Sequence, residues 1–438
     1  MDDPFSEHGF LHGVDAATLW SWVARQRWFG GKARTVKSWA VRNTLAAGDA
    51  LLLALGVTYA DGNETYLVPL GWAASAPEEA VVFKKGREVL CDATVLPEFR
   101  DWLFRALVPG VALRRLFREG ELPPSRVLKA EQSNTALIYG ERLFVKLYRR
   151  LVAGANPDAE LTQFLSEASG FRNVCGFGGT VTWDGAAVAL ATELTANKGD
   201  AWPLALAAAR EFYATGKLGD WLGKAALLGR RTGEMHTALA AAAGEDFVAE
   251  PFDDEDLRGL RAEIARLEST DRTALAERIA SLSETAASLA QRYLASPVER
   301  FHIELPDGAV KTRTHGDYHL GQVLWTGADF VIIDFEGEPS RSLAERRAKR
   351  SPLRDVAGML RSFHYAAHAA AASGDAAAEQ WAADSQVAFL AAWQEAAPSL
   401  APGLGLLPLF AAEKALYELA YELNNRPDWI RIPLQALA

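Results

Sequence analysis

The first third of the chain changes from a helical to an extended pattern of apolar residues and back. Residues 14–28 repeat apolar side chains at helical spacing. Residues 36–72 carry apolar runs separated by short GD and DGN turn sequences, and residues 80–91 continue this pattern. Residues 96–118 again have helical spacing. We therefore expect a small unit of sheet and helix over residues 1–105.

The middle of the chain predicts a second sheet. Residues 125–150 hold two apolar runs on either side of Gly140-Glu141, which is a hairpin signal. Asn156-Pro157 suits the start of a helix, because Asn caps helix N-termini and Pro is accommodated in the first turn. Another hairpin is predicted over residues 180–194. These elements make up the second expected region, residues 106–200.

The remainder, residues 201–438, is rich in alanine and has a largely helical pattern. The exception is residues 312–335, where two short strand-like pieces surround a polar loop. A sheet-rich first half and a helical second half predict the α+β fold class.

Composition excludes several classes of protein. The 438 residues carry a net charge of −10, and an acidic surface repels nucleic acid. No run reaches the roughly 18 apolar residues of a membrane span, so we expect no membrane association. Two cysteines, Cys91 and Cys175, cannot form a disulfide framework. These features predict a cytoplasmic protein.

The polar loop holds the residues that carry chemistry. In THGDYHLGQVLW, Asp317 precedes Gln322 by five positions, and the next apolar strand ends at Asp334. Phosphoryl transfer needs a base that orients a hydroxyl and oxygen ligands that hold Mg²⁺. The spacing is that of a kinase catalytic loop, with Gln in place of the usual Asn. The combination predicts a phosphotransferase.

Upstream residues supply groups for a nucleotide. Lys146 lies within an apolar strand, where a charge is costly unless it is paired, and Glu160 on the following helix is the expected partner. The alternative is an edge-strand lysine that points to solvent. A polar turn before this strand offers backbone N–H groups to phosphate, although it also suits an ordinary hairpin; it consists of Gln132, Ser133, Asn134 and Thr135.

Two other pairs have alternative interpretations. His315 and His319 are spaced like metal ligands, but we favour hydrogen bonds that shape the catalytic loop. Arg354 and Asp355 are candidates for a buried ion pair.

Three segments resemble the aminoglycoside-phosphotransferase-like kinases, and more closely the actinobacterial maltokinase group, which includes glucosamine kinases. They are THGDYHLGQVLW, residues 332–367 and residues 413–434, and RQRWFGGK near the N-terminus resembles that group's cap. The resemblance implies a bilobal protein-kinase-like fold with a cap subdomain (1–105), an intermediate nucleotide-binding subdomain (106–200) and a helical C-lobe (201–438).

The resemblance also implies roles for individual residues. Asp317 is the implied catalytic base, and Lys146, paired with Glu160, holds the ATP phosphates. The implied Mg²⁺ ligands are Gln322, Asp334 and, for a second ion, Glu336. The implied adenine contacts are backbone groups of Glu193 and Leu194.

The acceptor is expected to lie against the C-terminal helices. Glu418 and Glu422 share a helix face, where like charges repel unless a cation joins them. Asn424 stands where the maltokinase pattern commonly has arginine, which makes the pocket friendlier to an ammonium group. We therefore favour glucosamine, converted to the 6-phosphate; in the alternative interpretation Glu422 simply pairs with Arg426. The candidate acceptor contacts are Asp317, His319, Glu418, Glu422, Asn425 and Trp429.

Three other functions stay open: a maltokinase that makes maltose 1-phosphate, an aminoglycoside-type antibiotic kinase, and a non-catalytic regulator that binds nucleotide or carbohydrate. Lys146, Asp317, Gln322 and Asp334 are all present, which argues against the last of these. The sequence makes no prediction about protein partners.

Overall fold

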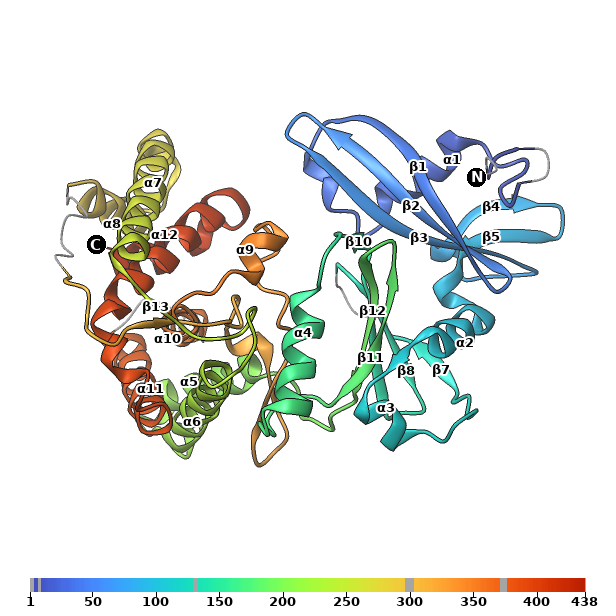
Figure 1. Cartoon of the computed structure of the whole chain (residues 1–438). Helices are drawn as coiled ribbons and strands as arrows, with labels where there is room; N and C mark the ends of the chain where they lie inside the picture. The colour runs from blue at the N-terminus through green and yellow to red at the C-terminus, as the bar shows by residue number, and fades with distance from the viewer. Residues whose placement is uncertain (1–3, 7–8, 129–132, 296–302, 371–375, 438) are drawn as a thin grey trace. The chain divides into compact units, whose positions relative to one another are not determined.

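The computed structural model describes residues 4–6, 9–128, 133–295, 303–370 and 376–437. The chain forms two compact units (Figure 1). The first contains Met1–Glu167 and Cys175–Thr195, and the second contains Ala168–Val174 and Ala196–Ala438.

The first unit is built on two antiparallel sheets. The order is β1-β2-β3-β5-β4, with β10 also on β3, in one sheet and β6-β11-β12-β9-β8-β7 in the other. The strands are β1 (Val36–Ala47), β2 (Ala50–Tyr59), β3 (Asn63–Ala73), β4 (Val81–Lys85), β5 (Glu88–Asp92), β6 (Val108–Pro109), β7 (Ser125–Val127), β8 (Thr135–Tyr139), β9 (Leu143–Leu147), β10 (Arg150–Leu151), β11 (Phe177–Trp183) and β12 (Ala186–Glu193). The helices are α1 (Ala16–Arg25), α2 (Pro97–Ala106), α3 (Val111–Leu116) and α4 (Pro157–Gln163).

Local signals explain the hairpins and the start of α4. Glu141 and Asp184 have φ angles of 51° and 52°, the left-handed conformation that tight hairpin turns require. Asn156 caps α4 as predicted, because its side chain accepts a hydrogen bond from Ala159 N. These turns and this cap confirm the predicted hairpins and helix start.

The two sheets share one hydrophobic core. A single cluster of buried side chains contains Leu52 and Leu67 of the first sheet together with Leu137 and Val145 of the second. A second cluster packs α1 on the other side of the first sheet. The first sheet is therefore an integral part of the unit.

The second unit is mostly helical, as predicted. Its helices are α5 (Ala201–Thr215), α6 (Trp221–Ala240), α7 (Asp254–Arg278), α8 (Glu284–Ala295), α9 (Leu343–Arg347), α10 (Leu353–Ala370), α11 (Ala376–Ala396), α12 (Leu407–Asn425) and α13 (Arg431–Leu437). Its strands are β13 (Glu250–Pro251), β14 (Val310–Lys311), β15 (Val323–Trp325) and β16 (Phe330–Ile332). The strand pair β15–β16 lies within the segment predicted to interrupt the helices. In the part of the chain that the structure describes, no helix is long and apolar enough to cross a membrane.

Candidate active site

A buried carboxylate from α10 fixes the loop that carries Asp317. Asp355 is 1% exposed. Its Oδ2 accepts a hydrogen bond from His315 N at 2.8 Å, and its Oδ1 accepts one from Gly316 N at 2.9 Å. One side chain thus holds the two backbone amides directly before Asp317, and low solvent access strengthens both bonds.

His236 on α6 completes this anchor. Its Nε2 lies 3.1 Å from Asp355 Oδ2, and its Nδ1 lies 3.0 Å from Trp393 Nε1. Because an indole nitrogen only donates, His236 Nδ1 accepts and Nε2 carries the proton toward Asp355. Burial favours the neutral carboxyl, but His236, His315 and the Gly316 amide together outweigh it and hold the pKa of Asp355 below its ordinary value. The sequence gives no signal for this contact, since 119 residues separate the partners.

A short hairpin places Gln322 near Asp334. The turn Leu320–Gln322 leads into β15, which pairs with β16, and Ile333 N donates to Gln322 O at 3.0 Å. Both residues are half-buried at the same end of this hairpin. Amide and carboxylate oxygens are ligands that Mg²⁺ prefers, so this pair fits the predicted metal ligands.

The backbone at Asp334 adds a second sign of function. Among the described residues, three that are not glycine have positive φ angles, and two of these lie in hairpin turns. Asp334, with φ of 67°, follows β16 and precedes Phe335 outside any such turn. Strained conformations of this kind are concentrated at functional sites. Glu336 is half-buried, and its role as a further metal ligand stays a prediction.

Both histidines of the loop make backbone contacts. His315 Nε2 lies 2.9 Å from Ile333 O, which joins the catalytic loop to the end of the hairpin. His319 Nδ1 accepts from Gly321 N at 3.0 Å. Burial lowers the pKa of His319 despite the nearby Asp317 carboxylate. These contacts suit the loop-shaping interpretation of the pair.

A network of ion pairs lies next to Asp317. Arg354 and Arg341 both contact Glu338 and Glu413, so the predicted pairing of Arg354 with Asp355 is wrong. Lys414 joins the same network from α12. Lys414 is not among the residues predicted from the sequence; its position one turn before Glu418, on the predicted acceptor face, is the signal that could have found it.

In the first unit, Lys146 is paired with a carboxylate of α4. The strand β9 lies between β12 and β8, which excludes the edge-strand interpretation of this lysine. Lys146 Nζ lies 2.8 Å from Asp158 Oδ2, and both side chains are largely buried. The carboxylate shown here is Asp158, two residues before the predicted Glu160. Glu160 is half-buried, and its proposed pairing stays a prediction.

The polar turn before β8 contacts an arginine that the sequence analysis overlooked. Arg149 Nε donates to Thr135 Oγ1 at 2.8 Å, and Arg149 N lies 3.4 Å from Asn134 Oδ1. Ser133 is exposed. Gln132 lies outside the described residues. The expected phosphate contacts of this turn stay a prediction.

Glu193 and Leu194 use their backbone donors within the first unit. Glu193 N donates to Gly176 O, and Leu194 N donates to Arg142 O, both at 2.8 Å. The Glu193 side chain forms an ion pair with Arg115. Because these two N–H groups are already used, an adenine at this position would have the backbone carbonyl groups of Glu193 and Leu194 as its hydrogen-bond acceptors.

The two glutamates of the predicted acceptor face already have cationic partners. Glu418 accepts from Arg361 Nε at 2.8 Å, and Glu422 accepts from Arg426 Nη2 at 2.6 Å. Tyr365 Oη also donates to Glu422 at 3.1 Å. The alternative interpretation of Glu422, a pair with Arg426 on one helix face, is the arrangement present in the structure.

Two further acceptor candidates contact their own surroundings. The Asn425 side chain is exposed and donates to Tyr421 O at 2.8 Å. The Trp429 ring stacks on Tyr365 with centroids 6.2 Å apart, and the Arg426 guanidinium lies 4.8 Å from its centroid. Their contacts with a sugar stay predictions.

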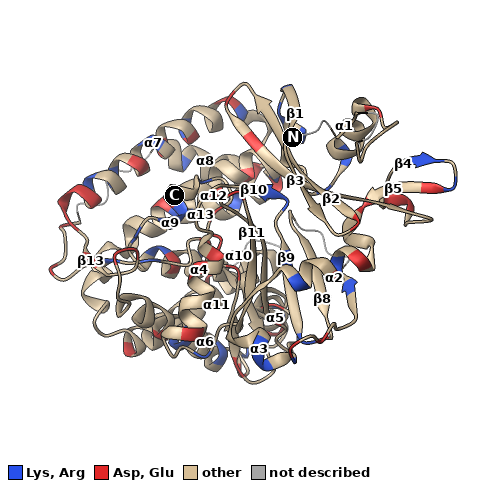
Figure 2. Ribbon diagram, turned by 45° about the vertical axis from the view of Figure 1, so that its right-hand side comes forward, with Lys and Arg blue, Asp and Glu red and all other residues tan. Residues whose placement is uncertain are grey.

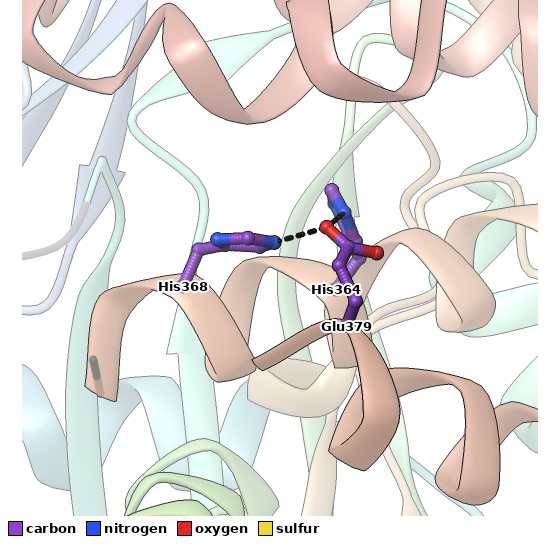
Figure 3. A group of neighbouring side chains, drawn as sticks. All are labelled: His364, His368 and Glu379. Atoms are coloured by element: carbon purple, nitrogen blue, oxygen red, sulfur yellow. Dashed lines mark hydrogen bonds and ion pairs between the residues drawn. The ribbon is translucent and has the colours of Figure 1, made fainter. Parts of the chain in front are cut away.

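A second polar cluster joins α10 to α11. His364 and His368 both direct Nε2 toward Glu379 Oε1, at 3.2 and 2.8 Å (Figure 3). The set could hold a metal ion, but Arg361 and Arg431 approach the two Nδ1 atoms at 3.2 and 3.5 Å.

These arginines decide how the cluster is protonated. Guanidinium groups only donate, so each Nδ1 accepts and each Nε2 carries the proton that Glu379 receives. Metal-bound histidines instead donate Nδ1–H to an acceptor, which is the opposite arrangement. Burial, against the pull of Glu379, lowers the pKa of His364 to about 4. The cluster is a hydrogen-bonded link between helices.

Comparisons with known proteins identify two domains in the chain. Residues 22–106 match the maltokinase N-terminal cap domain, and residues 126–337 match the phosphotransferase enzyme family. A glucosamine kinase of Streptacidiphilus jiangxiensis is 27% identical over 327 residues, which cover 70% of this chain and 71% of that protein. One of Mycolicibacterium smegmatis is 29% identical over 335 residues, covering 71% and 78%.

A solved structure has the same fold. A glucosamine kinase in complex with glucosamine, ADP and inorganic phosphate superposes with a TM-score of 0.64 at 21% identity, covering 95% of this chain and 97% of that one. The family match and the two kinase relatives identify an ATP-dependent phosphotransferase that acts on a hydroxyl group. The chain thus carries a domain of the phosphotransferase enzyme family, preceded by a maltokinase-type N-terminal cap. The predicted family and α+β fold class are confirmed.

Proposed function

We propose that this protein phosphorylates glucosamine with ATP and forms the 6-phosphate. The observation that carries the kinase assignment is the Asp317 loop, whose backbone amides are held by the buried Asp355. The choice of glucosamine is supported by two relatives named glucosamine kinases, each aligned over more than two thirds of this chain.

The chemistry follows from the residues present. Asp317 accepts the proton of the sugar hydroxyl as the oxygen bonds to the γ-phosphorus, while the bond from that phosphorus to the β–γ bridging oxygen breaks and ADP leaves. Lys146 binds the ATP phosphates. Mg²⁺, held by Gln322 and Asp334 with Glu336 as a further ligand, neutralises charge on the phosphates when bound.

Glu422 is the better candidate for the sugar ammonium group. Its partner Arg426 is 46% exposed, whereas Arg361, the partner of Glu418, is 7% exposed. An ammonium group can displace an exposed guanidinium at a smaller cost than a buried one, because the displaced cation is rehydrated more easily. Glucosamine therefore competes with Arg426 for Glu422.

The test is ADP release with ATP, Mg²⁺ and a panel of acceptors. The panel contains glucosamine, N-acetylglucosamine, glucose, maltose and an aminoglycoside antibiotic. We expect glucosamine to have the highest kcat/KM, and N-acetylglucosamine to lose at least about tenfold because it lacks the charge. ³¹P NMR of the product then assigns the phosphorylated hydroxyl. Turnover of maltose without glucosamine would favour the maltokinase, as the cap domain allows, and turnover of the antibiotic alone would favour a resistance kinase.

Asp317→Asn separates catalysis from binding. We expect this variant to lose at least about 100-fold in kcat while it still binds ATP, because a carboxamide cannot take the proton. Isothermal titration calorimetry with ATP measures the retained binding. Wild-type protein that binds ATP and turns over none of the panel would instead support the non-catalytic regulator.

A further inference from the structure

Lys414 is paired with a buried carboxylate, Glu338, whose two oxygens both have cationic partners. Its Nζ lies 3.0 Å from Glu338 Oε1. Glu338 is 2% exposed, and its Oε2 accepts from Arg341 at 2.7 Å and from Arg354 at 3.3 Å. Because both oxygens of Glu338 are occupied, the position of the ammonium group is set by the protein.

The same ammonium group reaches the catalytic carboxylate. Lys414 Nζ lies 3.6 Å from Asp317 Oδ1, and the lysine side chain is 20% exposed. This distance is that of an ion pair and is longer than a direct hydrogen bond. Because the lysine side chain is largely shielded from water, its charge is only partly screened and acts strongly on the neighbouring carboxylate.

The two loops that Lys414 contacts are themselves in contact. Gly316 and Gly337 both have positive φ angles, 85° and 73°. A Cβ atom on Gly316 would lie 3.2 Å from Gly337 Cα. Asp317 and Glu338 each follow one of these glycines, so Lys414 fastens both carboxylates at the place where the loops pack.

Lys414 has two carboxylate partners. The network contains three cations, Arg341, Arg354 and Lys414, and three glutamates, Glu338, Glu413 and the exposed Glu345. Asp317 is the second carboxylate that Lys414 contacts. Burial disfavours the charged lysine, but Glu338, Asp317 and Glu418 together outweigh it and raise the pKa of Lys414, so the cation persists at neutral pH.

We infer that Lys414 is a positioning residue for catalysis: it holds Asp317 Oδ1 and leaves Oδ2 to accept the proton of the acceptor hydroxyl. The inference rests on the proposed role of Asp317 as the base.

Kinetics of Lys414→Met and Lys414→Arg test this role, with whichever acceptor the wild-type enzyme phosphorylates best. We expect Lys414→Met to lower kcat by about 10- to 100-fold, less than loss of the base itself, with little change in KM. The loss falls on kcat rather than KM because the base is misplaced while the binding groups are unchanged. Lys414→Arg restores part of kcat.

Lys311→Met is the matched control. Lys311 is 21% exposed and pairs with Asp256 at 2.9 Å. We expect this variant to keep the wild-type kcat and KM. A purely structural Lys414 would lower the stability of its Met variant and leave kcat of the folded enzyme unchanged, and that result overturns the inference.

A second measurement needs no acceptor and so separates this inference from the proposed substrate. Thermal unfolding is compared for Lys414→Met, Asp317→Asn and the double variant. If the two side chains interact, the fall in Tm of the double variant is smaller than the combined falls of the single variants. Additive falls contradict the inference, even where glucosamine proves to be the wrong acceptor.

Discussion

Helices α10 and α7 belong to the same unit but differ in almost every respect. In α10, 14 of its 18 residues are buried, including Asp355, Arg361, His364 and His368. In α7, 4 of its 25 residues are buried. Figure 2 shows acidic and basic residues along α7, most of them on its exposed sides.

The partners of the charged residues explain the difference. On α10 they come from distant elements, as with His236 for Asp355 and Glu418 for Arg361. On α7 the pattern is mixed: Arg266 pairs with Glu263 within the helix, whereas Asp256 pairs with Lys311 and Arg278 donates to Leu423 O. The buried charged residues of α10 therefore fix tertiary structure, whereas the exposed pairs within α7 contribute little.

Asp355→Ala is expected to have the largest effect. It leaves the amides of His315 and Gly316 and the Nε2–H of His236 without their acceptor. Three buried donors without partners cost about 5 kcal/mol of unfolding free energy, measured by urea denaturation. Kinase activity falls below detection because the loop of Asp317 is released. Asp384→Ala is the control, because this half-buried carboxylate of α11 accepts from Gln380 one turn away, and both measurements should change little.

Asp271 is the exception on α7, and it predicts a pH dependence. It is 1% exposed, and burial raises its pKa to about 7. The unfolded carboxyl ionises near pH 4, so between about pH 4 and 7 the native state binds more protons. Stability from this group is present below pH 4 and falls by about 1.4 kcal/mol per pH unit up to pH 7.

Asp271→Asn removes this slope. Urea denaturation across pH 4 to 8 should give a flatter curve than the wild type and a higher stability at pH 8. The exposed Glu277→Gln, six residues further along α7, keeps the wild-type slope. An unchanged slope in Asp271→Asn would mean that the carboxyl is solvated.

Two glycines test how closely each helix is packed. A Cβ atom on Gly358 of α10 would lie 2.6 Å from Tyr318 O, in the catalytic loop, whereas one on Gly259 of α7 meets nothing within 4 Å. Gly358→Ala should therefore cost about 1–3 kcal/mol and lower kcat. Gly259→Ala should stabilise by about 0.5–1 kcal/mol through helix propensity. Equal effects of the two substitutions would remove the contrast between the helices.

The smallest effect is expected at the Arg266–Glu263 pair. The side chains are 61% and 31% exposed, so water and salt screen the interaction. A double-mutant cycle with Arg266→Ala and Glu263→Ala should give a coupling free energy below about 0.5 kcal/mol. A coupling several times larger would mean that surface pairs of α7 contribute to the fold.

Local features of the structure follow from the sequence. The hairpin turns at Gly140-Glu141 and Asp184-Gly185 and the Asn156 cap depend on neighbouring residues alone, and each was predicted. The catalytic loop was recognisable because Asp317, Gln322 and Asp334 are close in sequence. Their individual roles stay predictions.

Contacts between distant residues did not follow from the sequence. The pairing of Lys146 with Asp158 depends on how α4 packs against the sheet, which the pattern of that helix alone does not specify. The pairing of Lys146 with Glu160 stays a prediction. Likewise the spacing of Glu418 and Glu422 predicts repulsion between the two carboxylates. In the structure Glu418 is neutralised by Arg361, which lies 57 residues away and could not be foreseen from this spacing. The spacing of apolar and charged residues describes the faces of one helix, whereas the partners Lys146 and Arg361 lie on other elements.

Arg149 makes the cap inseparable from the rest of its unit. Its guanidinium is 2% exposed, pairs with Asp92 of β5 at 2.6 Å and lies 5.0 Å from the ring centroid of Trp28. Asp92 and Trp28 belong to the cap, residues 1–105. Arg149 instead follows β9 and donates to Thr135 of β8, in the second sheet. Excising residues 1–105 would remove both the counter-ion of Arg149 and part of the shared hydrophobic core. A chimaera that exchanges the cap therefore needs to keep the Arg149–Asp92 pair together.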